Sequence, residues 1–106
     1  VLEEEREPTP PLLIGEGACD HPFAGRSLVN VSGMSYGAIS KPAVQALSRG
    51  AAKAGCWMDT GEGGLSPYHL EGGCDLIFQI GTAKYGVRDE QGRLSPEKLR
   101  EAAAHE

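Results

Sequence analysis

The stretch that decides the fold covers residues 28–64 and reads LVNVSGMSYGAISKPAVQALSRGAAKAGCWMDTGEGG. It opens with a short β-branched run, residues 28–32, which favours a buried strand over a helix. A helical pattern follows over residues 40–54, and a second apolar run covers residues 56–60. Two strands joined by a helix within about 30 residues form a βαβ unit, whose strands are parallel.

The predicted helix has sequence signals at both ends. Ser40 can cap it, and Pro42 lies in the first turn, where a missing N–H group costs nothing. Gly55 follows the last helical residue, where a left-handed conformation is favoured. The apolar stripe on one face consists of Val44, Leu47, Ala51 and Ala54.

The segments on either side give weaker signals. Residues 1–27 contain an acidic run and many Pro and Gly residues, which predict an extended lead-in without strands. Residues 66–67 can open a short helical turn, and residues 76–80 form a third strand-like run. Residues 81–92 are predicted to be a loop, and a second helix begins at Ser95.

Length and composition indicate a thin core. The chain has 106 residues, of which 15 are Gly and only 6% are aromatic. A chain of this size buries only about 60–70% of its unfolded surface. It starts at Val1 and stops at Glu106 within a helical pattern, so we expect a fragment of a longer protein. We divide it into the N-terminal lead-in, residues 1–27, and a partial α/β domain, residues 28–106.

Charge and hydropathy exclude several classes of function. The 15 acidic residues outnumber the 10 basic ones, for a net charge of −5, so nucleic-acid binding is not expected. No apolar run approaches the roughly 18 residues of a membrane-spanning helix, and no signal peptide is recognisable. The sequence therefore predicts a cytoplasmic location and no membrane segment.

Cysteine and histidine spacing predicts neither a disulfide framework nor a metal site. The four residues considered as metal ligands are Cys19, His21, His69 and Cys74, and their spacings match no common ligand pair. Without a C-x-x-C motif, reduced thiols are expected, with Cys56 in the core of a strand. We expect His69 and His105 at the surface.

Two Gly-rich loops follow the first two predicted strands, at the edge where α/β folds bind ligands. In residues 32–40, two glycines bracket Ser35 and Tyr36, and backbone N–H groups could hold the edge of a flat heteroaromatic ligand. A plain strand-to-helix turn is the alternative. Residues 60–64 lack the third Gly of a dinucleotide fingerprint and the Lys of a phosphate loop. Glu62 in that loop suits a cationic or protonated substrate atom, and a solvated surface carboxylate is the alternative.

Three motifs, in residues 33–40, 59–67 and 79–87, resemble in order and spacing the start of the FMN-binding synthase domain of glutamate synthases. The likeness covers residues 14–106, and it is closest to the stand-alone FMN-binding glutamate synthase family proteins. It implies the N-terminal portion of a (β/α)8 TIM barrel, truncated here because such barrels typically need about 250 residues.

The same resemblance implies a reaction and its partners. Reduced FMN would convert 2-iminoglutarate, formed from 2-oxoglutarate and free or glutamine-derived ammonia, to L-glutamate. The electrons would come from ferredoxin or from a pyridine-nucleotide-dependent partner. An iron–sulfur cluster and the family's active-site lysine would lie downstream, with no cluster ligands in this chain.

The resemblance also assigns site residues. The residues assigned to the flavin are Met34, Ser35, Tyr36, Gly37, Thr60 and Gln79. Those assigned to the substrate are Ser35, Glu62 and Lys84, with Glu62 as the catalytic residue. Lys84 stands where many family members have Arg, which keeps an ionic contact and loses bidentate geometry.

Two other functions are left open by the residues. One is a small, non-catalytic assembly or interaction module derived from the barrel scaffold, which would unfold cooperatively and form a defined oligomer. The other is a different FMN barrel oxidoreductase, such as a relative of the α-hydroxy-acid oxidases. By itself, this chain is expected to be inactive.

Overall fold

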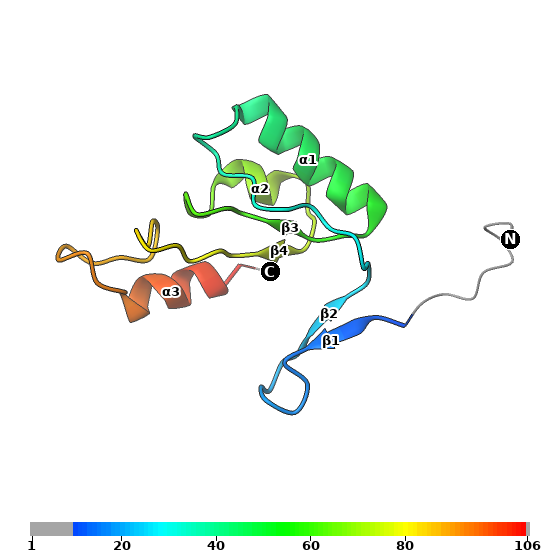
Figure 1. The fold of residues 1–106 in the computed structure, drawn as a ribbon, viewed down its shortest axis with the longest axis horizontal. Helices are drawn as coiled ribbons and strands as arrows, with labels where there is room; N and C mark the ends of the chain where they lie inside the picture. The colour runs from blue at the N-terminus through cyan, green and yellow to red at the C-terminus, as the bar shows by residue number, and fades with distance from the viewer. Residues whose placement is uncertain (1–9, 106) are drawn as a thin grey trace, which may run out of the picture.

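The structure, a computed structural model, describes residues 10–105 of the chain. The acidic run noted above, at residues 3–5 and 7, lies outside this range, as does Pro8. The elements are β1 (Leu12–Ile14), β2 (Phe23–Gly25), α1 (Lys41–Ala54), β3 (Met58–Asp59), α2 (Pro67–Glu71), β4 (Leu76–Ile77) and α3 (Pro96–Ala103). In Figure 1, α1 and α3 lie on opposite sides of β3 and β4, and the β1–β2 hairpin projects away from the helices.

Three parallel segments lie side by side in chain order. Val31 forms a parallel bridge to Met58, and Met58 is also the parallel partner of Leu76 in β4. The connection from Val31 to β3 runs through α1, so the predicted βαβ unit is confirmed. A second crossover, through α2, joins β3 to β4. The carboxyl ends of all three segments therefore point to one edge.

The strand predicted to start at Leu28 is wrong in its first half. Leu28 and Val29 are each 81% exposed, and parallel pairing begins only at Val31. The cause is a long-range bond, because the side-chain oxygen of Asn30 accepts the Trp57 N–H at 3.0 Å. Side-chain bonds of this kind compete with a backbone ladder.

The hairpin corrects the prediction that residues 1–27 contain no strand. β1 and β2 pair antiparallel, with Leu13 opposite Ala24. The Gly15 carbonyl accepts the N–H groups of Ala18 and Cys19, both at 3.0 Å, which closes the connecting turn. Gly and Pro content alone does not distinguish an extended chain from a closed turn, which is why the prediction fails here. β1 is exposed along its whole length.

α1 begins and ends where the sequence predicts. The Ser40 hydroxyl accepts the Ala43 N–H at 3.4 Å, and Gly55 ends the helix in the left-handed conformation with φ of 71°. One face of α1 packs against β3. The buried apolar residues of this cluster are Val44, Ala51 and Met58.

The core is as thin as the composition predicts. Over residues 10–105, the buried apolar side chains are four, namely Val44, Ala51, Met58 and Val87. Cys56, predicted to lie in a strand core, precedes β3 and is half-buried against the α1 cluster. Few side chains thus hold the helices on the strands.

α2 and α3 both start with Ser-Pro, and their capping bonds are alike. The Ser66 and Ser95 hydroxyls accept the N–H groups of His69 and Lys98, each at 3.3 Å. α3 buries no residue, whereas α2 buries His69 completely. The prediction that His69 lies at the surface is therefore wrong, while His105 is exposed as predicted.

Candidate functional site

An open hollow of about 500 Å³ lies at the carboxyl ends of the three parallel segments. Its lining residues are Ser32, Gly33, Ser35, Asp59, Gly61, Glu62 and Gln79. They come from the last residue of β3 and from the loops that follow Val31, β3 and β4. This edge is where parallel α/β folds bind ligands.

The first loop is held against the second by backbone and hydroxyl contacts. The Met34 N–H donates to the Asp59 carbonyl at 3.1 Å, and the Gly63 N–H donates to the Ser35 hydroxyl at 3.1 Å. Gly61 has a φ of 74°, and a Cβ there would lie 2.7 Å from the Ser35 nitrogen. Glycine at position 61 is therefore required both by conformation and by the close approach of the two loops.

A buried side chain of the second loop forms hydrogen bonds that hold the third loop. Thr60 is completely buried, and its hydroxyl accepts the Gln79 N–H at 3.2 Å and donates to the Gly61 carbonyl at 3.1 Å. The Asp59 carboxylate accepts the Gly61 N–H at 2.7 Å. A Cβ at Gly33 would lie 2.9 Å from the Gln79 side-chain oxygen, so all three loops meet closely.

Glu62 is exposed at the rim of the hollow. Its carboxylate lies against Gly81, where a Cβ would be 2.7 Å from the nearer oxygen. Together with Asp59 it gives the lining two carboxylates, and the lining contains no cationic side chain. A hollow of this charge favours a neutral or cationic ligand atom over a phosphate.

The hollow brings together three of the predicted site residues, Ser35, Glu62 and Gln79. The others lie elsewhere. Thr60 lies inside the protein with its hydroxyl already bonded, and the Met34 side chain packs against the core.

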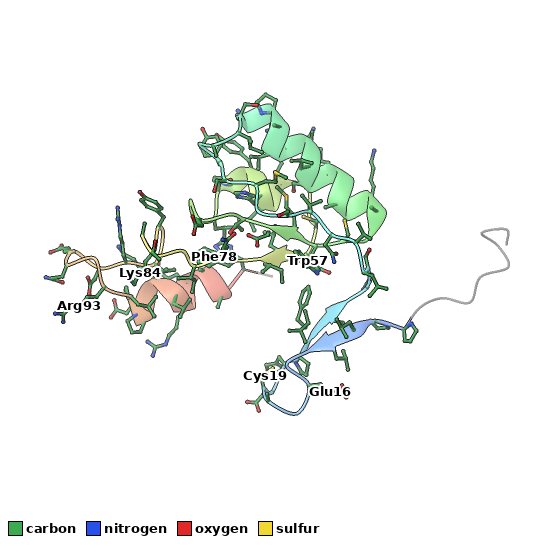
Figure 2. The ribbon with its side chains drawn as sticks, in the orientation of Figure 1. Glu16, Cys19, Trp57, Phe78, Lys84 and Arg93 are labelled. Carbon is green, nitrogen blue, oxygen red and sulfur yellow. The ribbon has the colours of Figure 1, made fainter. Side chains whose placement is uncertain are left out.

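Tyr36, Gly37 and Lys84 also lie outside the lining. Tyr36 is 46% exposed, and its ring meets Tyr68 edge-on with 4.9 Å between centroids. Gly37 is exposed, with a φ of 113°. The Lys84 ammonium donates to a backbone carbonyl two residues earlier at 3.2 Å, and Figure 2 shows Lys84 on the segment between β4 and α3.

Sequence reasoning missed Asp59 and His69. Asp59 is the last residue of β3 and directly precedes the Gly-rich loop, and this position was the available signal. The His69 Nδ1 accepts the Ser66 N–H at 3.0 Å, and its Nε2 lies 2.7 Å from the Met34 carbonyl. Because a backbone N–H only donates, Nδ1 carries no proton and Nε2–H donates to Met34. The Ser-Pro-x-His pattern of a capping box was the signal for this residue.

Burial changes the chemistry of one thiol. Burial raises the pKa of the Cys74 thiol, and a contact with the Ser48 hydroxyl at 3.9 Å partly offsets this rise. A raised pKa keeps the thiol protonated and unreactive. Over residues 10–105, no three His, Cys, Asp or Glu side chains gather as metal ligands, and no helix is long and apolar enough to cross a membrane.

Residues 2–106 match the family described as the conserved region in glutamate synthase. The chain belongs to the glutamate synthase family. The resemblance predicted from the three motifs is therefore confirmed, and family membership favours this assignment over a relative of the α-hydroxy-acid oxidases.

Relatives within the glutamate synthase family are much longer than this chain. The glutamate synthase large subunit-like protein YerD of Bacillus subtilis is 52% identical over 89 residues, which cover 83% of the chain and 17% of that protein. A large subunit-like protein of Rhizobium meliloti is 32% identical over 95 residues, or 90% of the chain and 20% of the relative. The archaeal-type glutamate synthase [NADPH] of Dehalococcoides mccartyi is 36% identical over 78 residues, or 71% and 16%.

The chain spans at most a fifth of the length of these three proteins. No solved structure matches it.

Proposed function

We propose that this chain contributes the first strands and loops of an FMN-binding (β/α)8 barrel, and that the whole protein reduces 2-iminoglutarate to L-glutamate. The observation that carries the proposal is that three successive loops, at the carboxyl ends of parallel strands, line one shared hollow. Parallel strands that pair in chain order are the way a barrel is wound. Membership of the glutamate synthase family supplies the reaction class.

The lining fits the edge of a flavin ring. The Ser35 hydroxyl and the Gln79 amide can bond the carbonyl and nitrogen atoms of such a ring. Among residues 10–105, the Ser35 N–H has no hydrogen-bond partner, so it is free to donate to a ligand. Without a cation in the lining, the FMN phosphate would bind residues outside this hollow.

Several of the predicted flavin contacts would act indirectly or through the backbone. Thr60 positions Gln79, because the buried Thr60 hydroxyl accepts the Gln79 N–H. Met34, Tyr36 and Gly37 belong to the same loop as Ser35 and remain proposed contacts of that loop.

The chemistry that FMN would supply, when bound and reduced, is a hydride for the imine carbon. Glu62 would hold a proton or a hydrogen bond at the imine nitrogen, because its exposed carboxylate lies at the rim of the hollow. Asp59 keeps the second loop in place through its bond to the Gly61 N–H. The substrate carboxylates need a cation that the hollow lacks, and Lys84 is the proposed contact.

The remaining partners follow from this assignment. 2-Oxoglutarate and free or glutamine-derived ammonia would be the substrates, and ferredoxin or a pyridine-nucleotide-dependent partner would supply electrons. The name of the Dehalococcoides relative includes NADPH, which supports the second donor. Any iron–sulfur cluster would bind outside this chain, and a cytoplasmic location remains part of the proposal.

The test uses the full-length protein. Titration with FMN should quench flavin fluorescence, and the loaded protein should form glutamate from 2-oxoglutarate and ammonium with a chemical reductant. Glu62→Gln should lower the rate by about 100-fold, the scale of lost acid–base catalysis, without weakening FMN binding. Glu90→Gln, an exposed carboxylate on the loop before α3, is the matched control and should behave like wild type. A full-length protein that binds no FMN would show the proposal to be wrong.

A further inference from the structure

We propose that His69 is a positioning residue for the loop over residues 33–37, fixing the Met34–Ser35 peptide so that the Ser35 N–H faces the hollow. The inference rests on the proposed FMN site, because it assigns a ligand-binding role to that N–H group. No catalytic contact is assigned to His69 itself.

The argument begins with the geometry of one peptide. In a planar trans peptide the C=O and N–H groups point in opposite directions. The His69 Nε2–H binds the Met34 carbonyl from the interior of the protein, at 2.7 Å. The Ser35 N–H must then point away from His69. The Ser35 nitrogen lies beside Gly61, where a Cβ would be 2.7 Å from it, and both residues line the hollow.

Hydrogen bonds hold both the backbone and the ring of His69. The Ser48 hydroxyl in α1 donates to the His69 carbonyl at 2.7 Å and accepts the Gly72 N–H at 2.9 Å. The Ser66 N–H donates to Nδ1, which sets the ring tautomer. Because the backbone and the ring are both held, the position of Nε2 is determined by the packing of α2 on α1.

Capping of α2 does not explain the hydrogen bond that the second ring nitrogen of His69, Nε2, makes with Met34. Capping α2 uses only Nδ1, within three residues of Ser66. The Nε2 bond instead reaches Met34, which is 35 residues away in sequence. The buried imidazole therefore joins a short helix to the loop that lines the hollow.

Two amide substitutions separate the two roles. In His69→Asn, the amide can replace Nδ1 and accept the Ser66 N–H, but it is too short to reach Met34. In His69→Gln, the amide nitrogen can replace Nε2 and donate to the Met34 carbonyl. Ser66→Ala removes the capping hydroxyl together with its 2.7 Å contact to Nδ1, but it keeps the Ser66 N–H bond to Nδ1 and the Nε2 donor, so it is the control for loss of the cap.

The first arm measures FMN dissociation constants of the full-length protein by fluorescence quenching. His69→Asn should weaken FMN binding about tenfold, the size of one lost hydrogen bond. His69→Gln and Ser66→Ala should stay within about twofold of wild type. Equal losses of FMN affinity in His69→Asn and His69→Gln would overturn the inference. An unchanged FMN dissociation constant in His69→Asn would do so as well.

The second arm needs no FMN. Hydrogen exchange of the apoprotein follows the Met34, Ala38 and Ile39 amides, whose bonds to Asp59 and Ser35 hold the loop. His69→Asn should speed their exchange, and His69→Gln and Ser66→Ala should not. Unchanged exchange in His69→Asn would overturn the positioning role. If exchange responds but wild type binds no FMN, the proposed function fails while the contact of His69 with the loop stands.

Discussion

The segment over residues 31–79 and the elements that flank it are built in different ways. In this core unit, five side chains have no exposed surface among those described, namely Val44, Ser48, Met58, Thr60 and His69. In the flanks, β1 is exposed throughout and α3 buries no residue. Outside residues 31–79, Val87 is the one completely buried side chain among those described. The flanking elements are therefore held mainly by local turn and capping bonds, whereas the core unit depends on burial.

The core unit also differs from the flanks in its buried polar side chains. Ser48, Thr60 and His69 are buried, and each bonds a segment distant in sequence or a neighbouring loop. A buried polar group is tolerated only when it is bonded, so removing one partner is costly. Buried hydrogen bonds therefore hold the loops that line the hollow as well as the helices behind them.

The largest difference between the two regions is expected from core truncation. Met58→Ala should destabilise the core unit by about 2–5 kcal/mol, because Met58 has no exposed surface. Leu13→Ala, at a 42% exposed position in β1, should change stability by less than about 0.5 kcal/mol. Hydrogen exchange of the α1 amides in the full-length protein measures both. Similar effects of the two variants would contradict the division into core unit and flanks.

Glycine substitutions should distinguish crowded from open positions within the core unit. An Ala Cβ at Gly72 would overlap the Ser48 backbone and hydroxyl, so Gly72→Ala should cost about 1–3 kcal/mol. Gly50 in α1 has no atom within 4 Å of such a Cβ, and Gly50→Ala should stabilise by about 0.5–1 kcal/mol. The same α1 exchange measurement gives both values, and opposite signs are the decisive result.

A smaller and local effect is expected in the C-terminal flank. Ser95→Ala removes the hydroxyl that accepts the Lys98 N–H, which costs about 1 kcal/mol of helix stability. Because α3 buries nothing, exchange should accelerate in α3 and stay unchanged in α1. Acceleration in both helices would mean that α3 is coupled to the core unit.

The smallest effect concerns pH. Since burial raises the pKa of the Cys74 thiol, the unfolded chain releases this proton at lower pH than the folded chain does. Stability should be fully retained below the ordinary thiol pKa of about 8.5 and decline as the pH rises above it. Cys74→Ala should remove that part of the alkaline decline. At neutral pH, mass spectrometry should show Cys74 alkylated more slowly than the exposed Cys19.

Local signals made part of this fold predictable. The limits of α1 follow from Ser40 and Gly55, and both caps form as expected. The order of parallel segments follows from the βαβ pattern. Local patterns failed at Leu28, because the competing bond from Asn30 to Trp57 joins residues 27 apart in sequence.

The candidate site was predictable to a similar extent. The convergence of polar residues after parallel strands predicts Ser35 and Glu62 at one edge, and the structure brings them together there with Gln79, which only the family resemblance indicated. His69 was assigned to the surface, since an isolated histidine gives no indication that both ring nitrogens will find partners. One partner, the Met34 carbonyl, is brought to it only by tertiary packing.

The contact between Glu62 and Gly81 has a consequence for how such a site can vary. Any side chain at position 81 would press on the carboxylate and displace it, because only the end of a flexible side chain stands in its way. A single Gly81→Ala replacement would thus move a negative charge without removing it and without altering any residue that lines the hollow. The charge of the hollow can therefore change its position through a residue outside the lining.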